Sequence, residues 1–392
     1  MNQQQKQYDI VIFGATGFTG QLLAEYCQQQ YANSGLKWAI AGRNQNKLAA
    51  IKQQYNIDDS VDSLIADSND IASLRHIAQQ TAVIISTVGP YQLYGEKLLQ
   101  ACVESGIGYV DLCGEPTWMH NMINKYQSLA ENSGAKIIFS CGFDSVPFDL
   151  GVYLLQKQQI DKGLAPFKHV KGRVRKMQGK FSGGTAASLK ATLNAAFTDP
   201  KVMQILTDPY ALASNSPRVE QPAGDQIYFD EQLNSWTSPF IMAAINTRNV
   251  LRSNMLLGHA YGEDFTYDEM LLTGAGEQGE ALAKMVANDK SLSGDDAPKP
   301  GEGPTKEERD NGFYDIIFVA QDDKQHSHIL SVSAELDPGY GSTSKMLTES
   351  ALTLLQEFNN IAGGIYTPAS ALGSHLIERL EKFAGLRFTK EQ

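Results

Sequence analysis

Cysteine is scarce in this sequence, and the cysteines stand far apart along the chain. The 392 residues contain four, Cys27, Cys102, Cys113 and Cys141, which form neither a C-x-x-C motif nor a cluster with histidine. A structural zinc site or a redox dithiol needs such spacing. We therefore expect no metal site and four reduced, mostly buried thiols. Because Cys113 and Cys141 follow predicted strands, the alternative that one of them lines a ligand site stays open.

Long apolar runs and clusters of basic residues are also missing. No apolar segment approaches the roughly 18 residues that a membrane span requires, and the N-terminus is polar and rich in glutamine, unlike a signal peptide. Acidic residues number 44 against 33 basic ones, a formal net charge of −11. These features predict a cytoplasmic protein with no transmembrane segment and no nucleic-acid partner. The chain is longer than one hydrophobic core usually serves, which favours two domains.

What the sequence does contain, at residues 8–20, is a buried parallel strand that runs into a turn punctuated by glycine. Such a turn before a helix brings backbone N–H groups close to the diphosphate of a dinucleotide. The spacing is G-x-x-G-x-x-G, which differs from the G-x-G-x-x-G pattern, and a plain structural turn is the alternative. The predicted cofactor-binding residues of this turn are Gly14, Ala15, Thr16, Gly17, Phe18, Thr19 and Gly20.

The end of the second predicted strand, at residues 38–41, indicates which dinucleotide is bound. An acidic side chain here would accept a hydrogen bond from a ribose 2′-hydroxyl, but the strand is followed by Gly42 and Arg43. A guanidinium binds a 2′-phosphate through two hydrogen bonds and stacks on adenine. Arg43 therefore favours NADP(H) over NAD(H), with a solvent-exposed arginine at a helix start as the alternative.

Beyond this point short apolar runs alternate with helical patterns, which is typical of parallel βαβ units. Strands at 8–13, 37–41, 61–66, 82–87, 108–112 and 136–140 predict an α/β fold with a Rossmann doubly wound parallel sheet. From about residue 143 the pattern changes to a half-exposed strand at 168–177 and a hairpin of 313–320 with 328–336, whereas 264–286 is predicted as a helix. A second domain of the α+β class, with a mixed or antiparallel sheet, accounts for this change.

Three segments follow from this pattern. Residues 1–142 should form the NAD(P)-binding Rossmann domain, and residues 143–368 a domain for substrate binding and dimerisation. Residues 369–392 should form a C-terminal helix that packs back on the Rossmann domain. The stretch 289–312 is rich in Gly, Pro and charged residues, so it is either a lid over a site or a disordered loop.

Ligands of open parallel sheets bind outside the carboxyl ends of the strands. The fourth strand ends in residues that should line the cofactor, namely Ser86, Thr87, Val88, Gly89 and Pro90. Tyr91 follows, and it either donates a proton, covers the nicotinamide face or packs under a loop. Asp67, at the end of the third strand, is placed to meet the adenine, with a capping role as the alternative.

The sixth strand runs into Asp144 and Ser145, at the junction of the two predicted domains. A substrate should lie at this junction, which makes Asp144 the acid/base candidate by location. A role as helix cap explains Asp144 equally well.

Motifs along nearly the whole chain resemble the saccharopine dehydrogenase-like oxidoreductases, and in particular the branch of the trans-acting enoyl reductases. In the first predicted domain they are the turn Gly14–Gly20, Ala41-Gly42-Arg43, Thr87–Tyr91, Tyr109–Glu115 and Gly142–Pro147. In the second they are Pro239–Ala243, Arg252-Ser253-Asn254, Pro300–Pro304 with Arg309, Asp337–Gly341 and Gly363–Ala369.

The resemblance implies a Rossmann domain with a second mixed α/β domain, an NAD(P)-type cofactor and a homodimer. In the enoyl reductase branch the substrate is an unsaturated acyl thioester, either a small molecule or a chain held by the carrier of a synthase. For that chemistry Tyr91 is the expected proton donor, Ser145 a donor at the junction and Arg252 an anion clamp, unless Arg252 forms an interdomain salt bridge. A saccharopine-type oxidoreductase of a C=N bond and a non-catalytic nucleotide-binding protein are the alternatives.

Overall fold

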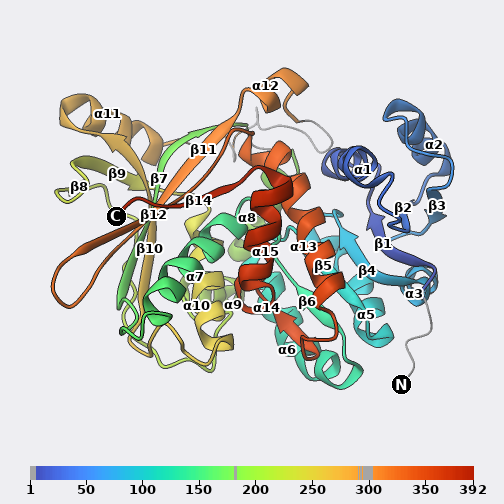
Figure 1. The fold of residues 1–392 in the computed structure, drawn as a ribbon, viewed down its shortest axis with the longest axis horizontal. Helices are drawn as coiled ribbons and strands as arrows, with labels where there is room; N and C mark the ends of the chain where they lie inside the picture. The colour runs from blue at the N-terminus through green and yellow to red at the C-terminus, as the bar shows by residue number, and fades with distance from the viewer. Residues whose placement is uncertain (1–5, 181–182, 290, 292–293, 295–302) are drawn as a thin grey trace.

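The computed structural model describes residues 6–180, 183–289, 291, 294 and 303–392, which form two sheets of seven strands. The two sheets lie on opposite sides of the molecule, and several helices lie between them (Figure 1). Sheet A contains β1–β6 and β13, and sheet B contains β7–β12 and β14. This architecture confirms the predicted α/β class with a Rossmann-like sheet and a second, mixed sheet.

Sheet A is parallel throughout and has the order β13-β6-β5-β4-β1-β2-β3. Its strands are β1 Tyr8–Phe13, β2 Trp38–Gly42, β3 Asp62–Ile65, β4 Thr81–Ser86, β5 Gly108–Asp111, β6 Lys136–Ile138 and β13 Gly364–Tyr366. The first six confirm the predicted strands. The seventh, β13, comes from the segment that the sequence assigned to the second domain, so the chain returns to sheet A near its end.

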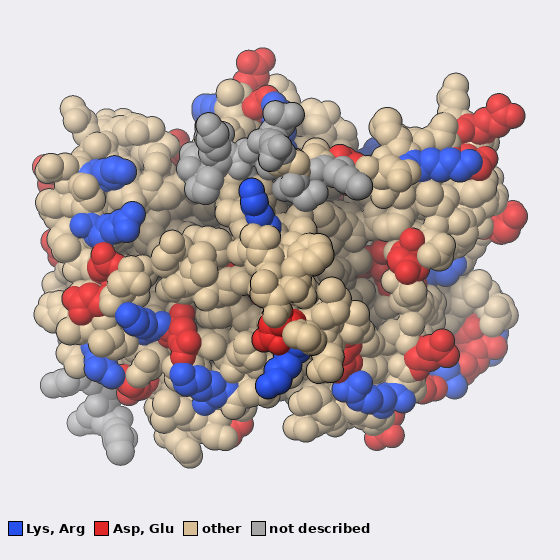
Figure 2. All heavy atoms as spheres, turned by 180° about the vertical axis from the view of Figure 1, so that it is seen from behind, with Lys and Arg blue, Asp and Glu red and all other residues tan. Residues whose placement is uncertain are grey.

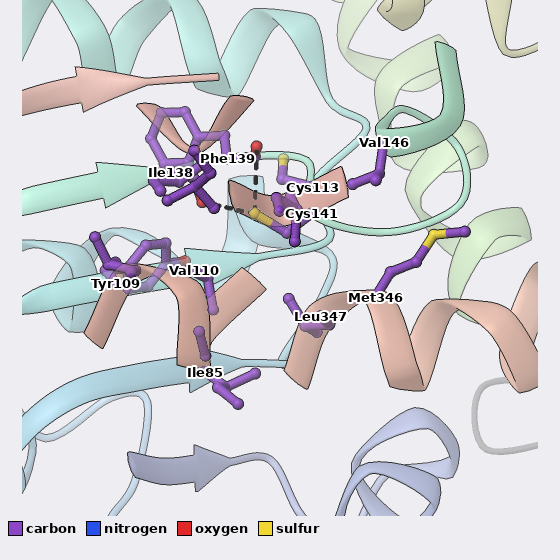
Figure 3. Close-up of a cluster of buried hydrophobic side chains, with 14 of the residues drawn as sticks. Ile85, Tyr109, Val110, Cys113, Ile138, Phe139, Cys141, Val146, Met346 and Leu347 are labelled. Carbon is purple, nitrogen blue, oxygen red and sulfur yellow. Dashed lines mark hydrogen bonds between the residues drawn. The ribbon is translucent and has the colours of Figure 1, made fainter. Parts of the chain in front are cut away.

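Helices cover both faces of sheet A. Those from the first part of the chain are α1 Phe18–Tyr31, α2 Gln45–Gln54, α3 Ile71–Gln80, α4 Tyr91–Tyr94, α5 Glu96–Ser105 and α6 Pro116–Ser133. A later helix, α13 Thr343–Glu357, packs on β4, β5 and α1. Figure 3 shows Leu347 of α13 beside Ile85 and Val110, whereas the Met346 side chain points away from these two strands. All four side chains belong to the buried core.

Sheet B is mixed and has the order β14-β12-β11-β7-β10-β9-β8, in which β7 and β10 are parallel and the other pairs antiparallel. Its strands are β7 His169–Gln178, β8 Phe229–Asp230, β9 Ser235–Pro239, β10 Thr266–Gly274, β11 Phe313–Gln321, β12 Ser327–Ala334 and β14 Arg387–Lys390. The predicted hairpin is confirmed by β11 and β12.

The helix predicted over 264–286 is wrong in its first half. Residues of β10 pair with both β7 and β9, and a separate helix, α11 Gly276–Ala287, follows. Tyr267, Met270 and Leu271 stand three and four residues apart, which imitates a helical stripe. Pairing with two neighbouring strands stabilises the extended form, and Gly274, with φ of +95°, ends it before α11.

The remaining helices follow β6, β7, β9, α11 and β13 along the chain. They are α7 Val146–Ile160, α8 Gly183–Thr198, α9 Pro200–Thr207, α10 Ala243–Leu256, α12 Lys306–Asp310, α14 Pro368–Ala371 and α15 Gly373–Arg379, with π-helical turns at Pro338–Ser342 and Leu380–Ala384. After α15 the chain adds β14 to sheet B beside β12. The prediction of a C-terminal helix over residues 369–392 is therefore wrong in its last part, because pairing with β12 stabilises the extended form. The division of the chain at residues 142 and 368 stays a prediction. Within the described residues no helix is long and apolar enough to cross a membrane.

Candidate active site

The glycine turn after β1 has the geometry that a diphosphate requires. Gly14 has φ of +92°, and a Cβ on Gly20 would lie 2.3 Å from the carbonyl oxygen of Gly14. Helix α1 follows Gly17, with no side chain capping its first turn and no acidic residue within it. Its first N–H groups and the positive end of its dipole are therefore available to an anion. The turn fits the diphosphate of a dinucleotide.

A cavity of about 730 Å³ opens in front of this turn. Its volume lies within the range typical of ligand and cofactor sites, roughly 300–1,000 Å³. Nine predicted cofactor residues line it: Gly14, Thr16, Gly17, Phe18, Thr19, Arg43, Thr87, Val88 and Gly89. Ala15 and Gly20 are buried within the turn itself, where they shape the backbone.

Three other predicted cofactor residues, Asp67, Ser86 and Pro90, do not line this cavity. The Asp67 carboxylate accepts the N–H of Asn69 at 2.8 Å, and the neighbouring Ala66 and Ser68 reach the cavity instead. This turn-forming hydrogen bond favours a structural role for Asp67 over contact with adenine. Ser86 is buried at the end of β4, and Pro90 precedes α4.

Arg43 lies at the end of β2 with an exposed side chain that lines the cavity. Within the described residues it has no hydrogen-bond or ion-pair partner, and the next side chain, Asn44, caps α2 by accepting the N–H of Lys47 at 3.0 Å. A cationic group without a partner at this place suits a 2′-phosphate.

Tyr91 contributes to the cavity wall, but its hydroxyl is already engaged. It donates to the carbonyl oxygen of Ser86 at 3.0 Å, and the ring packs on Trp118 with 5.4 Å between centroids. Burial raises the pKa of this hydroxyl well above its usual value. Because the phenol is both buried and bonded, the packed alternative fits Tyr91 better, and we no longer propose it as the proton donor.

Asp144, in the loop between β6 and α7, reaches the junction of two cavities. It lines the large cavity and a smaller one of about 50 Å³, which lies between sheet A and the turn at Pro338–Ser342. Its carboxylate accepts no hydrogen bond from the residues that the structure describes. Within those residues, nothing therefore supports the alternative that Asp144 caps α7. Burial raises the pKa of Asp144 to about 6. A carboxyl group with this pKa can hold or release a proton near neutral pH.

Tyr340 also lines both cavities, and the sequence analysis did not single it out as a site residue. It is 2% exposed, and its hydroxyl is buried without a hydrogen-bond partner among the described residues. The ring meets that of Phe18 edge-on, with 4.6 Å between centroids. Burial and then the negative charges of Asp144 and Asp337 raise the pKa of the phenol, which keeps it protonated. A buried hydroxyl without a partner is uncommon and points to a ligand that supplies one.

The other two predicted catalytic residues have partners within the protein. The Ser145 hydroxyl donates to Oδ1 of Asn246 and accepts from Nδ2 of Asn249, each at 3.1 Å, although the residue does line the small cavity. Arg252 is buried, lines neither cavity, and donates to the carbonyl oxygens of Leu212 at 2.7 Å and Ile365 at 2.6 Å. Its guanidinium connects α10 to β13, so we no longer propose Arg252 as an anion clamp.

The surface charge, the potential metal ligands and the cysteines were compared with the sequence predictions. Figure 2 shows one face of the molecule, on which basic and acidic side chains are interspersed without a patch of either sign. No group of three or more His, Cys, Asp or Glu side chains within the described part of the chain is placed to hold a metal ion. The cysteines are buried, and burial raises the pKa of Cys113, which lines the small cavity, well above its usual value.

Comparisons with known proteins agree with this geometry. Residues 10–138 match the family described as the saccharopine dehydrogenase NADP binding domain. The trans-acting enoyl reductases of Mycobacterium tuberculosis (strain H37Rv) and Mycobacterium ulcerans are 32% and 31% identical to this chain, each over 97% of both chains. Among solved structures, saccharopine dehydrogenase (L-Glu forming) from Saccharomyces cerevisiae has a TM-score of 0.56 at 10% identity and covers 98% of this chain and 99% of its own. That last likeness concerns the fold alone.

Proposed function

This chain belongs to the saccharopine dehydrogenase-like oxidoreductases, in the branch of the trans-acting enoyl reductases, and we propose that it reduces the C=C bond of an enoyl thioester with NADPH. The observation that carries the proposal is the meeting of Asp144 and Tyr340 at one cavity with the glycine turn. The first is a carboxyl group with a raised pKa, and the second is a phenol without a partner. Reduction of a conjugated C=C bond needs one proton donor and one donor to the thioester oxygen.

The residues for the cofactor follow from the cavity. The N–H groups at the start of α1 hold the diphosphate, Gly17 permits close approach of the backbone, and Arg43 holds the 2′-phosphate. Thr87, Val88 and Gly89 lie farther along the wall, beside the end of β4. We propose that NADPH is preferred to NADH because Arg43 offers a cation to the phosphate that distinguishes the two.

Replacing Arg43 by Ala should weaken NADPH binding about 10- to 100-fold, which corresponds to a hydrogen bond to a charged group of about 1.5–3 kcal/mol. NADH affinity should change little, because NADH has no 2′-phosphate. Titration calorimetry with both nucleotides measures the difference. The control is Lys37→Ala, which removes an exposed cation just before the other end of β2. Equal losses for NADPH and NADH in Arg43→Ala would refute the assignment.

In the proposed reaction each side chain has one role. NADPH held by the glycine turn and Arg43 would supply the hydride that reduces the β-carbon of the enoyl group. The Tyr340 hydroxyl donates a hydrogen bond to the thioester oxygen, where negative charge collects as the β-carbon is reduced. Asp144 then transfers its proton to the α-carbon, which leaves a saturated acyl thioester and an Asp144 carboxylate that regains its proton from water. Phe18, packed on Tyr340, keeps the phenol in place.

The pH dependence follows from the raised pKa of Asp144, which acts as an acid and is active only when protonated. The protonated fraction falls as pH rises through about 6, so kcat should fall with rising pH, approaching tenfold per unit well above the pKa. Bound NADPH excludes water and adds negative charge, and both effects raise the pKa of Asp144 further. In the complex, kcat should therefore begin to fall at a higher pH. A pH profile of kcat in single-turnover mixing measures this. A rate that increases with pH from 6 to 8 would contradict it.

The reaction class is tested with a panel of acceptors. Stopped-flow mixing of the NADPH complex with an enoyl thioester, an imine and a ketone of similar size should show oxidation of NADPH with the enoyl thioester. Oxidation with the imine alone would favour a saccharopine-type activity instead. Absence of oxidation with every acceptor, together with measurable NADPH binding, would favour a non-catalytic protein. The homodimer and the cytoplasmic location expected from the sequence stay predictions, and light scattering measures the former.

A further inference from the structure

Two helices beside the site, α8 and α9, are apolar but almost unburied. The side chains of α8 include Leu189, Leu193 and Phe197, yet Gly183 and Ala186 are its buried residues, and α9 has none. Leu193 is 40% exposed, Phe197 89% and Met203 of α9 48%. A helix in a soluble protein normally turns its apolar stripe into the core. Apolar surface left open beside a cavity marks a place where an apolar ligand binds.

One face of α8 lines the large cavity from Gly184 to Leu193. The lining residues form two series with a spacing of four, which places them in one stripe: Gly184, Ser188 and Thr192, and Thr185, Leu189 and Leu193. Polar residues predominate near Asp144, and leucines begin one turn later. At 1.5 Å per residue, the stripe extends about 12 Å from Thr185 to Leu193. This length matches roughly eight to ten carbon atoms of an extended alkyl chain.

Other residues that line the cavity are also apolar. They are Tyr94 of α4, Pro116 of α6, Leu206 of α9, and Ile241 and Ile245 before and within α10. Among the described residues that line the cavity, those with a charge are Arg43 and Asp144, at the nucleotide end and at the reaction centre. The rest of the described lining therefore carries no charged partner for a phosphate or a carboxylate, and it suits an uncharged chain.

Polar contacts hold α8 and α9 over the cavity in place of a packed core. Ser188 donates to Oε1 of Glu115 at 2.7 Å, and Gln92 donates to Oγ1 of Thr192 at 3.2 Å. Arg248 of α10 donates to the carbonyl oxygen of Leu206 at 2.5 Å. These bonds fix the position of the helix pair and leave its apolar side chains free to contact a ligand.

We propose that α8, α9 and the start of α10 form an acyl channel that makes the enzyme specific for thioesters with a long aliphatic chain. The channel is defined by Tyr94, Leu189, Leu193, Leu206, Ile241 and Ile245. The chain enters away from the nucleotide end and places its enoyl group at Asp144 and Tyr340. Leu193, at the far end of the α8 stripe, sets the length of chain that fits. This inference rests on the proposed function for the identity of the reacting group.

The test compares short and long acyl chains on the same pantetheine head. Each buried methylene should raise kcat/KM about 4-fold until the channel is filled, so trans-2-dodecenoyl-pantetheine should exceed crotonyl-pantetheine by at least about 100-fold. Leu193→Trp should remove most of this preference, because the larger side chain shortens the space that a long chain can fill. The matched control is Asn194→Trp, since Asn194 is the exposed neighbour of Leu193 and does not line the cavity. An equal preference in the native enzyme and Leu193→Trp would overturn the proposal.

A second measurement tests binding of the acyl chain independently of the proposed reaction. Saturated dodecanoyl-pantetheine cannot be reduced, but it should raise the Tm of the native chain and of Asn194→Trp, and not that of Leu193→Trp. If this pattern holds while no thioester is turned over, the channel stands and the proposed reaction fails. If dodecanoyl-pantetheine and acetyl-pantetheine shift the Tm of the native chain equally, the channel fails, whatever the activity. Leu193 is partly exposed, so its replacement leaves the packed core intact.

Discussion

Replacing Asp144 by Asn is expected to lower kcat by about 10²- to 10⁴-fold, the usual contribution of a positioned proton donor. The amide keeps the shape of the side chain but has no acidic proton to give to the α-carbon. Affinity for NADPH should stay nearly constant, because the N–H groups of α1 and Arg43 hold the nucleotide. The fall of kcat with rising pH should disappear with the carboxyl group. Single-turnover rates over a range of pH, with Kd for NADPH from calorimetry, measure these effects.

The matched control for this variant is Asp67→Asn. Asp67 follows β3 near the nucleotide end but does not line the cavity. Its replacement should leave kcat within about 3-fold, with at most a small loss of stability from the turn in which it accepts the Asn69 N–H. If Asp144→Asn kept the native rate and the native pH profile, the proton would have to come from another group, and our assignment of Asp144 would be wrong.

Tyr340→Phe should produce the second large effect, a fall in kcat of about 10²- to 10³-fold, as for the loss of one donor to a developing oxyanion. The substitution removes a single oxygen atom. Because that oxygen has no partner among the described residues, the free energy of unfolding should stay the same or rise by about 1–3 kcal/mol, the cost of an unsatisfied buried polar group. An active-site role therefore predicts lower activity together with unchanged or higher stability, a combination that a structural role does not produce.

Tyr91→Phe is the corresponding control. Its hydroxyl donates to the Ser86 carbonyl, so the substitution should lower the free energy of unfolding by about 1 kcal/mol. kcat should change by no more than a few-fold. Thermal or urea unfolding and kcat, measured for both tyrosine variants, give opposite patterns if the roles are as described. Loss of activity in Tyr91→Phe with full activity in Tyr340→Phe would restore Tyr91 as the donor and remove Tyr340.

The elements that were predicted correctly are those whose structure is determined by residues close together in the sequence. The glycine turn needs a strand, three glycines and a helix in succession, and Gly14 and Gly20 occupy positions where a Cβ would collide with the backbone or with Thr87. Arg43 lies at the cavity for a similar reason, because the end of β2 is adjacent to β1 in a parallel sheet. Local pattern and the rules of parallel topology suffice for such residues.

The elements that were not predicted are those whose structure is determined by residues far away in the sequence. β13 joins sheet A through β6, more than 200 residues away, and β10 is a strand because β7 and β9 pair with it. Tyr340 comes to the cavity through the turn before α13, and its neighbour Phe18 belongs to α1. Its glycine-rich surroundings, Asp337–Gly341, were the available signal. Tyr91 does lie at the cavity and Arg252 does not, and only the folded chain shows that the polar atoms of both are already bonded.

The central claim, that this chain reduces an enoyl thioester at Asp144 and Tyr340, is tested most directly by the origin of the two new hydrogens. The measurement is mass spectrometry of the product formed from dodecenoyl-pantetheine with NADPH deuterated on the nicotinamide ring, in ordinary water, and then with unlabelled NADPH in deuterium oxide. Our account predicts one deuterium at the β-carbon in the first case and one at the α-carbon in the second, with both products formed about 10²- to 10⁴-fold more slowly in Asp144→Asn. Deuterium from the nicotinamide at any position other than the β-carbon, or an unreduced thioester in the presence of bound NADPH, would contradict it.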